Sequence, residues 1–284
     1  MRIEIAKLSG YCFGVKRALE LTGAILDKYK NKNNKVYSIG EIIHNRGVIE
    51  ELESKGLKIV EKVEEIEPGS VFIVRSHGIP PHLMEEIKER KVKIIDTACP
   101  FVKRAQSKAK MLSKKGYHVV IIGNKRHPEV MSEMEFADKD KLSVIETPEE
   151  ISLIGRKNRI GVIMQTTQIK ENAKAIISGL LDRSNEILIE NTICNITEKR
   201  QKITKELYQK VDLMLVVGGK NSANTTHLAQ IAKKYNPNTY HIEKYNEIDI
   251  SWFKPDTHIG IIGGASTPQK DIKSVKEYIE SLNI

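Results

Sequence analysis

The feature that most constrains the fold is an internal repeat built around three cysteines. Each cysteine opens a short segment that ends in a Lys-Arg pair, and these segments are Cys12–Arg17, Cys99–Arg104 and Cys194–Arg200. Successive cysteines are 87 and 95 positions apart in the 284-residue chain. A repeat of this length predicts several copies of one supersecondary unit.

A second marker recurs in the same phase. It begins with an apolar residue and Glu, closes on Glu-Ile, and starts 48, 46 and 48 residues after the respective cysteines, at Val60–Ile66, Ile145–Ile151 and Ile242–Ile248. Two independent markers in one phase are hard to obtain by chance. The sequence therefore predicts three units, at residues 1–97, 98–192 and 193–284.

Each unit carries Val- and Ile-rich runs that end in polar loops. These runs lie at 36–39, 71–74, 119–122, 160–164, 213–217 and 259–262, and further apolar runs precede the cysteines at 3–6, 92–95 and 187–189. Helical stretches alternate with them, for example at 83–90, 103–115, 172–181 and 225–234. Continuous apolar strands between helices predict parallel sheets buried on both faces. The expected fold class is α/β, with three pseudo-threefold-related units around a central site.

The polar loops hold the candidate functional residues. They are His44 and His77 in the first unit, His127, Glu129 and Thr166 in the second, and Ser222, Asn224 and Ser266 in the third. Functional groups of parallel sheets gather at the carboxyl ends of the strands. If the three ends face one axis, these residues and the cysteines converge on one site.

The three cysteines are better suited to a metal than to disulfides. Their number is odd, they lie far apart, and we expect a chain without a signal peptide. Each stands where a helix is expected to begin, with Lys-Arg about a turn later, and both features favour the thiolate that metals need. The alternative is that they are small buried hydrophobic residues.

The spacing bears on the kind of metal. A structural zinc site usually shows close cysteine pairs, which this chain lacks, although zinc held by three cysteines and a histidine stays open. Iron–sulfur clusters accept widely spaced cysteines. Three thiolates on a four-iron cluster leave one iron open to act as a Lewis acid on a substrate oxygen. We therefore expect a catalytic [4Fe-4S] cluster with three Cys ligands, Cys12, Cys99 and Cys194.

The charge is basic but dispersed. Lys and Arg number 46 against 37 Asp and Glu, which gives a formal net charge of +9. The lysines are interspersed with acids, and aromatic residues at 5% leave little material for a platform on which bases stack. We expect no nucleic-acid partner, because a basic interior that faces a small anionic substrate explains the charge equally well.

Localisation follows from the apolar pattern. No apolar run approaches the roughly 18 residues that a membrane span needs, and Met1–Glu4 is typical of a strand rather than a signal peptide. The expected protein is a cytoplasmic monomer with no membrane partner.

The ordered set of motifs resembles the 4-hydroxy-3-methylbut-2-enyl diphosphate reductase family. The resemblance runs from Gly10–Val15 to Gly264–Pro268 and includes Ile43–Asn45, Ser76–Gly78, Asp96–Pro100, His127–Val130, Gln165–Thr167, Asn191–Cys194 and Val217–Ser222. Each motif is weak alone, but together and in this order they are highly specific. The resemblance implies the last step of the methylerythritol phosphate route to isoprenoids.

The resemblance also implies a reaction and a cofactor. An iron–sulfur oxidoreductase of this family removes a hydroxyl from an allylic diphosphate with two electrons and protons. The products are isopentenyl and dimethylallyl diphosphate and water. The cluster is implied to be held by Cys12, Cys99 and Cys194. No flavin or nicotinamide fingerprint is visible, so a ferredoxin or flavodoxin is expected as the electron donor.

The family pattern assigns roles to the polar loops. The substrate-binding set is His44, His77, His127, Thr166, Thr167, Ser222, Asn224 and Ser266. A buried diphosphate needs many such donors. The catalytic set is Glu129, His127 and Thr166. Glu129 is the expected general acid, because a carboxyl in a partly dry site beside anions has a raised pKa, and Thr166 would relay its proton.

Two segments depart from the family pattern. Val130–Met134 replaces a small Gly-Thr segment, and Ala223 replaces a second serine before Asn224. The first puts the local loop shape in doubt, and the second removes one hydroxyl donor to the diphosphate.

Two rival functions remain open. One is a dehydrating condensation enzyme similar to quinolinate synthase, which also uses three cysteines on a threefold α/β scaffold. The other is a non-catalytic cluster protein, such as a redox sensor or a basic RNA-binding module. The second would not need His, Thr and Ser groups at every strand end.

Overall fold

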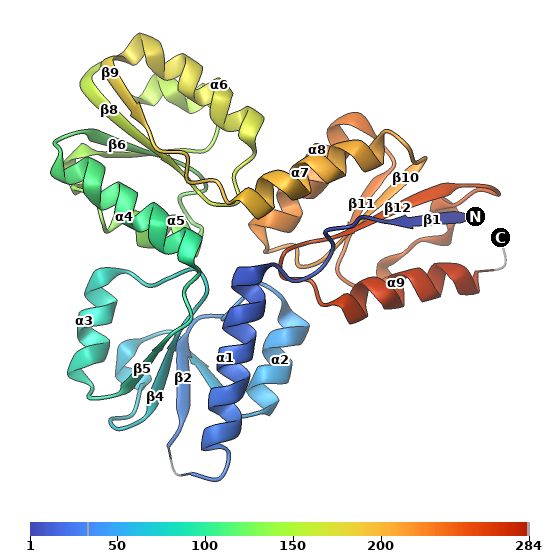
Figure 1. Ribbon diagram of the computed structural model, residues 1–284, viewed down its shortest axis with the longest axis horizontal. Helices are drawn as coiled ribbons and strands as arrows, with labels where there is room; N and C mark the ends of the chain where they lie inside the picture. Colours follow the sequence, from blue (N-terminus) through green and yellow to red (C-terminus); the bar gives the residue numbers. More distant parts are fainter. Residues whose placement is uncertain (33, 283–284) are drawn as a thin grey trace. The chain divides into compact units, whose positions relative to one another are not determined.

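The computed structural model describes residues 1–32 and 34–282 (Figure 1). Within these ranges the strands form three four-stranded sheets, and all neighbouring strands are parallel. The prediction of an α/β fold made of three similar parallel-sheet units is confirmed. No helix in the described ranges is both long and apolar enough to cross a membrane.

The chain divides into two compact bodies. Body 1 comprises residues 1–16, 44–50 and 195–284, and body 2 comprises residues 17–43 and 51–194. Body 1 holds one sheet and body 2 holds the other two. The predicted boundaries at 97/98 and 192/193 stay a prediction.

The first sheet of body 2 has the strand order β3-β2-β4-β5. Its strands are β2 (Val36–Ile39), β3 (Leu57–Val60), β4 (Val71–Val74) and β5 (Lys93–Asp96), and the helices of this part of the chain are α1 (Phe13–Tyr29), α2 (Arg46–Ser54) and α3 (Pro81–Glu89). The central strand β4 is buried along its whole length, as its apolar sequence predicts.

The second sheet of body 2 has the order β7-β6-β8-β9. Its strands are β6 (His118–Ile122), β7 (Leu142–Ile145), β8 (Lys157–Met164) and β9 (Ser184–Ile189), with helices α4 (Pro100–Lys114), α5 (Pro128–Met134) and α6 (Lys170–Leu180). Two apolar clusters cover its faces, one against α6 and one against α4 and α5.

The sheet of body 1 has the order β1-β12-β10-β11. Its strands are β1 (Arg2–Ile5), β10 (Leu213–Val217), β11 (Thr239–Ile242) and β12 (His258–Gly263), with helices α7 (Asn195–Tyr208), α8 (Ala223–Tyr235) and α9 (Gln269–Ser281). The strand nearest the N-terminus, β1, thus pairs with β12 near the C-terminus, although the sequence placed Arg2–Ile5 in the first unit.

The second sequence marker is a structural cap. Each copy begins at the last residue of an edge strand, β3, β7 or β11, and continues into a 3-10 turn. The carboxylate of its last glutamate accepts the backbone N–H four residues earlier, as Glu65 does from Glu61 (3.1 Å), Glu150 from Glu146 (2.7 Å) and Glu247 from Glu243 (2.9 Å). The marker therefore serves to close strands rather than to bind a ligand.

The three loops that lead into the cysteines share one backbone contact. Each loop follows an edge strand, and the cysteine N–H donates to a carbonyl in the loop after the adjacent strand. These bonds are Cys12 to Ala265 (3.0 Å), Cys99 to Ser76 (2.9 Å) and Cys194 to Thr166 (2.9 Å). Because the repeat preserves this bond, the thiols occupy equivalent positions in their sheets.

The arginine of each Lys-Arg pair holds the loop that leads into another cysteine. Arg17 donates to the carbonyls of Asp96 and Ala98 before Cys99, both at 3.3 Å. Arg104 donates to Asn191 before Cys194, also at 3.3 Å. Arg200 donates to Gly10 before Cys12, and to Gly263 at 2.7 Å. The pair that marks the repeat in the sequence therefore fixes the cysteine loops.

We predict that Arg200→Gln destabilises the protein far more than Arg104→Gln. Arg200 is 2% exposed, so its loss leaves buried carbonyls without donors at a cost of about 2–5 kcal/mol. Arg104 is exposed, and losing its contact should cost under about 1 kcal/mol. Urea unfolding of both variants measures the two costs, and equal costs would contradict the prediction.

Candidate functional site

The cysteines have accessible thiols at the starts of helices. All three lie within the described ranges, are partly buried and form no disulfide. Cys99 is the N-cap of α4, and Pro100 occupies the first helical position, as predicted. The Sγ of Cys12 lies 3.4 Å from the backbone N–H of Val15 in the first turn of α1. Thiols held at helix N-termini suit a metal that binds thiolates.

Two of the cysteine loops in body 2 have matching internal bonds. The hydroxyl of Thr97 donates to Val74 and that of Thr192 to Met164, both at 2.5 Å. The side chains of Asp96 and Asn191 accept the N–H two residues on, at 2.9 and 3.2 Å. The threonine bonds tie each loop to the end of the adjacent strand, β4 or β8, and the bonds of Asp96 and Asn191 close each loop on itself.

Body 1 brings together the predicted donors of the third unit, which we call the hydroxyl cluster: Ser222, Asn224 and Ser266. All three are at most 5% exposed. Ser266 Oγ lies 3.3 Å from Ser222 Oγ and donates to the carbonyl of His44 at 2.9 Å. Asn224 Oδ1 accepts the N–H of Ala265 at 2.9 Å, which leaves its NH₂ group for a ligand. Ser266 thus contacts two other predicted residues, Ser222 and His44, while the role of these residues as one site stays a prediction.

Gly218 makes the turn that positions the hydroxyl cluster. Its φ of +140° is unfavourable for other residues, and a Cβ there would overlap the hydroxyl of Thr267. The N–H of Ser222 then bonds back to Gly219 at 3.0 Å. The Gly-Gly segment is thus the tight turn that its sequence indicates, and α8 begins immediately after it.

Body 2 places the predicted acid against its predicted relay. Glu129 is 2% exposed, at the second position of α5. Its Oε1 accepts the N–H of Thr166 at 2.6 Å, and its Oε2 lies 2.9 Å from the Thr166 hydroxyl. Burial raises the pKa of Glu129, and the two bonds from Thr166 partly offset this. The carboxyl can therefore hold a proton at higher pH than an ordinary glutamate.

The backbone sets the tautomer of His127. Its Nδ1 accepts the N–H of Glu129 at 3.2 Å and so caps α5. In the neutral ring the proton must then lie on Nε2, which makes that atom a hydrogen-bond donor. The ring of His77 meets that of His127 edge to face, with centroids 5.5 Å apart. These two predicted diphosphate ligands are neighbours.

Thr167 follows the relay threonine, and its Oγ1 atom is buried. Gln165, on the other side of Thr166, accepts the N–H of Asn124 at 3.0 Å and so ties the loop after β8 to the loop after β6. The segment Gln165–Thr167 therefore joins two strand ends of one sheet.

The histidines assigned no role in the sequence lie elsewhere. His118 Nε2 is 2.8 Å from Ser143 Oγ, and His241 Nε2 is 2.9 Å from the carbonyl of Gly218. His82 and His258 lie 3.5 and 3.6 Å from the carboxylates of Glu135 and Glu4.

Sequence reasoning missed one buried ionisable residue, Glu133. It is 0% exposed and lies one turn after Glu129 on α5. Burial raises the pKa of Glu133 well above its ordinary value, and the neighbouring Glu129 raises it further. An acid among Val130–Met134 is typical of a helix surface, so the sequence held no sign of this burial.

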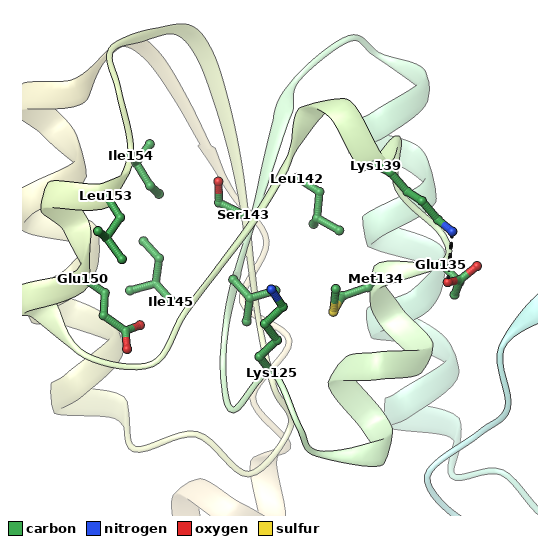
Figure 2. Close-up of a pocket in the computed structure, with 11 residues that line it drawn as sticks. Lys125, Met134, Glu135, Lys139, Leu142, Ser143, Ile145, Glu150, Leu153 and Ile154 are labelled. Atoms are coloured by element: carbon green, nitrogen blue, oxygen red, sulfur yellow. Dashed lines mark ion pairs between the residues drawn. The ribbon is translucent and has the colours of Figure 1, made fainter.

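A hollow of about 510 Å³ lies along the edge strand β7 of body 2 (Figure 2). Leu142 and Ile145 line it, together with Met134 from α5 and the ion pair of Glu135 with Lys139 (3.5 Å). None of the residues around it is a predicted site residue. The hollow is therefore separate from the candidate site.

Comparison with known proteins places this geometry in a family. A sequence model described as LytB protein matches residues 3–280. The 4-hydroxy-3-methylbut-2-enyl diphosphate reductase of Pelobacter propionicus is 42% identical, over 100% of this chain and 99% of that protein. The protein of the same name from Dictyoglomus thermophilum is 43% identical, over 99% and 97%.

Two solved structures are similar. One, of (E)-4-hydroxy-3-methyl-but-2-enyl diphosphate reductase, has a TM-score of 0.69 and 39% identity over 99% of this chain and all of that one. A reductase from Plasmodium falciparum has a TM-score of 0.91 over 100% of this chain and 88% of that one; at 24% identity it shows the fold alone. On this full-length similarity, the chain belongs to the LytB family of 4-hydroxy-3-methylbut-2-enyl diphosphate reductases.

Proposed function

We propose that this protein reduces 4-hydroxy-3-methylbut-2-enyl diphosphate to isopentenyl and dimethylallyl diphosphate and water. The names of its full-length relatives support this reaction. The observation that carries it is the buried Glu129 carboxyl with both oxygens against Thr166, because removal of a hydroxyl from carbon needs a proton donor in a dry site. A dehydratase similar to quinolinate synthase is not favoured, since relatives over the whole chain carry the reductase name.

The proposed cofactor is a [4Fe-4S] cluster held by Cys12, Cys99 and Cys194. The three thiols fit it: none is in a disulfide, each is partly accessible, and each stands at a helix start. When bound, the cluster would pass two electrons one at a time from the electron donor to the substrate, and it would offer one iron without a cysteine ligand as a Lewis acid. The proposed electron donor is a ferredoxin or flavodoxin, and the protein is proposed to act as a cytoplasmic monomer.

The reaction balances with two electrons and two protons. The carbon–oxygen bond breaks, one proton converts the departing hydroxide to water, and the other adds to a carbon of the allyl group. Which carbon takes that proton decides between the two products.

The proposed diphosphate donors are the residues that the family pattern assigns, and each body holds some of them. In body 1 the hydroxyl cluster offers Ser222, Asn224 and Ser266, together with His44. In body 2 the set comprises His127, whose Nδ1 accepts the N–H of Glu129, together with His77 and Thr167. Such donors replace the water that surrounds a diphosphate in solution.

The proton path runs from Glu129 to Thr166. The Thr166 hydroxyl lies 2.9 Å from Glu129 Oε2 and donates to it in the structure. When Glu129 is protonated, the direction of this bond reverses in the proposed path, and the threonine hydroxyl donates onward to the leaving group. The raised pKa of Glu129 keeps the acid protonated, so activity should fall as the pH rises through that pKa.

We predict that Glu129→Gln lowers kcat by about 10²–10⁴-fold, because the amide keeps the shape but supplies no proton. The rate is measured anaerobically as oxidation of a reduced viologen dye on addition of the substrate. Iron and sulfide content should match the wild type. A variant with wild-type kcat would contradict the proton-donor role.

We predict that Cys194→Ala abolishes stable cluster binding. Thiolates are the ligands of such clusters, and the chain has no spare cysteine to replace one. Bound iron and sulfide per chain after anaerobic reconstitution measure the effect, and circular dichroism checks that the variant folds. A wild-type protein that binds no iron and sulfide would overturn the cofactor assignment.

We predict that Ala223→Ser lowers the KM for the diphosphate. Ala223 follows Ser222 at the start of α8, and a hydroxyl there adds one donor beside the hydroxyl cluster. One hydrogen bond to a charged group is worth at most about 1.5–3 kcal/mol, or roughly ten- to a hundredfold. A KM that does not change would refute the missing-donor interpretation.

A further inference from the structure

Helix α5 carries two buried carboxyl groups on one side. Glu129 and Glu133 are 2% and 0% exposed and stand four residues apart, a spacing that brings side chains together on a helix. Glu135, at the C-cap of α5, lies 3.5 Å from the ammonium group of Lys139, as Figure 2 shows, and 3.5 Å from the ring of His82. Glu133 therefore differs from Glu135 in burial and in partners.

No donor group in the described part of the chain bonds the carboxyl oxygens of Glu133. Its neighbour one turn away on α5 is the buried Glu129, whose charge raises the pKa of Glu133. The buried residues of the nearby α4 carry no charge: they are Val102, Ala105, Gln106, Ala109 and Leu112. The contact from α4 beside Glu133 is neutral, from Gln106 to Ser132 at 2.9 Å.

Two carboxylates without a proton cannot occupy this place. A buried ionised carboxyl without a donor is very costly, and two adjacent buried charges of one sign are costlier still. The protonated form of Glu133 resolves both costs, since a neutral carboxyl has an O–H to donate and Glu129 is the acceptor in reach.

We propose that Glu133 is a positioning residue for the proton donor: its neutral carboxyl donates a hydrogen bond to Glu129 and stabilises the carboxylate that Glu129 becomes after protonating the substrate. The proposal rests on the proposed function of Glu129 as general acid. No proton leaves Glu133 in this scheme. Its O–H holds Glu129 in place for Thr166 and offsets the cost of creating a charge in a dry site.

Three variants separate this role from simple packing. Glu133→Leu fills a similar volume but has no donor, Glu133→Gln keeps an N–H donor that does not titrate, and Glu135→Gln removes a carboxylate from the same helix outside the site. Anaerobically reconstituted protein is assayed for kcat, KM and pH dependence with the dye. Iron and sulfide content serve as the loading check.

Glu133→Leu should lower kcat about ten- to a hundredfold with little change in KM, the effect of losing one hydrogen bond to a developing charge. The alkaline limb of the pH–kcat profile of this variant should move to higher pH, because Glu129 loses a hydrogen bond that favours its charged form. Glu133→Gln should restore kcat to within about threefold of the wild type and return the limb to its place. Glu135→Gln should match the wild type.

Wild-type kcat and alkaline limb in Glu133→Leu would overturn the proposal. So would a Glu133→Gln variant as impaired as the leucine variant, since the donor would then be irrelevant. If Glu129→Gln is fully active or the wild type does not reduce the diphosphate, the proposed function fails instead. The carboxyl pair is then judged by a readout that needs no activity.

That readout is the pH dependence of unfolding. A neutral Glu133 in the folded protein holds a proton that the unfolded chain releases above the ordinary pKa of glutamate. Stability from this group is therefore complete at low pH and lost as the pH rises through its raised folded pKa. In the wild type and in Glu135→Gln, Glu133 should contribute a rise in the unfolding constant of up to about tenfold per pH unit, in addition to the contribution of Glu129. The unfolding constant of Glu133→Gln should change less with pH than that of the wild type. An equal change with pH in the two proteins would count against a neutral Glu133.

Discussion

The structure depends on one backbone hydrogen bond that occurs three times, from the N–H of a cysteine to a carbonyl in the loop after the adjacent strand. A parallel sheet leaves the carboxyl ends of its strands at one edge, and this bond ties two neighbouring ends there. It explains why Ser76, Thr166 and Ala265 lie in polar loops beside cysteines far along the chain. The carbonyl of Thr166 accepts the N–H of Cys194, and the hydroxyl of Thr166 bonds to Glu129. The same loop residue therefore helps to position both a thiol and the acid.

The arginines of the Lys-Arg pairs add a second set of hydrogen bonds that hold the cysteine loops. Carbonyls that approach the end of an edge strand have no strand partner, and a guanidinium supplies several donors in a fixed plane. In body 1 the contacts of Arg200 are buried, whereas Arg104 in body 2 is exposed. The repeated arginine therefore holds a cysteine loop both where the arginine is buried and where it is exposed to solvent. The free energy of each contact follows the burial of the arginine rather than its sequence.

Strands and functional loops were predictable because their pattern is local. Val71–Val74 and Leu213–Val217 are continuous apolar runs, and burial on both faces leaves no other pattern for a parallel strand. The edge strands β3, β7 and β11 were missed, since Lys58, Ser143 and His241 interrupt their short apolar runs. The pairing of β1 with β12 was also missed, because it joins residues more than 250 positions apart and no local pattern records it.

The candidate site also contains one acid that the sequence indicated and one that it did not. Glu129 was predictable because it stands alone among polar loops, and its contact with Thr166 follows from two strand ends of one sheet. Glu133 was not, because burial of an acid depends on what packs over the helix and not on its neighbours in sequence. Both carboxyl oxygens of Glu133 are buried without a hydrogen-bond donor among the described residues, which is not the environment of a surface acid. A chain that buries a second acid beside the first accepts a loss of stability at neutral pH, and such a cost is typical of a group kept for what it does to its neighbour.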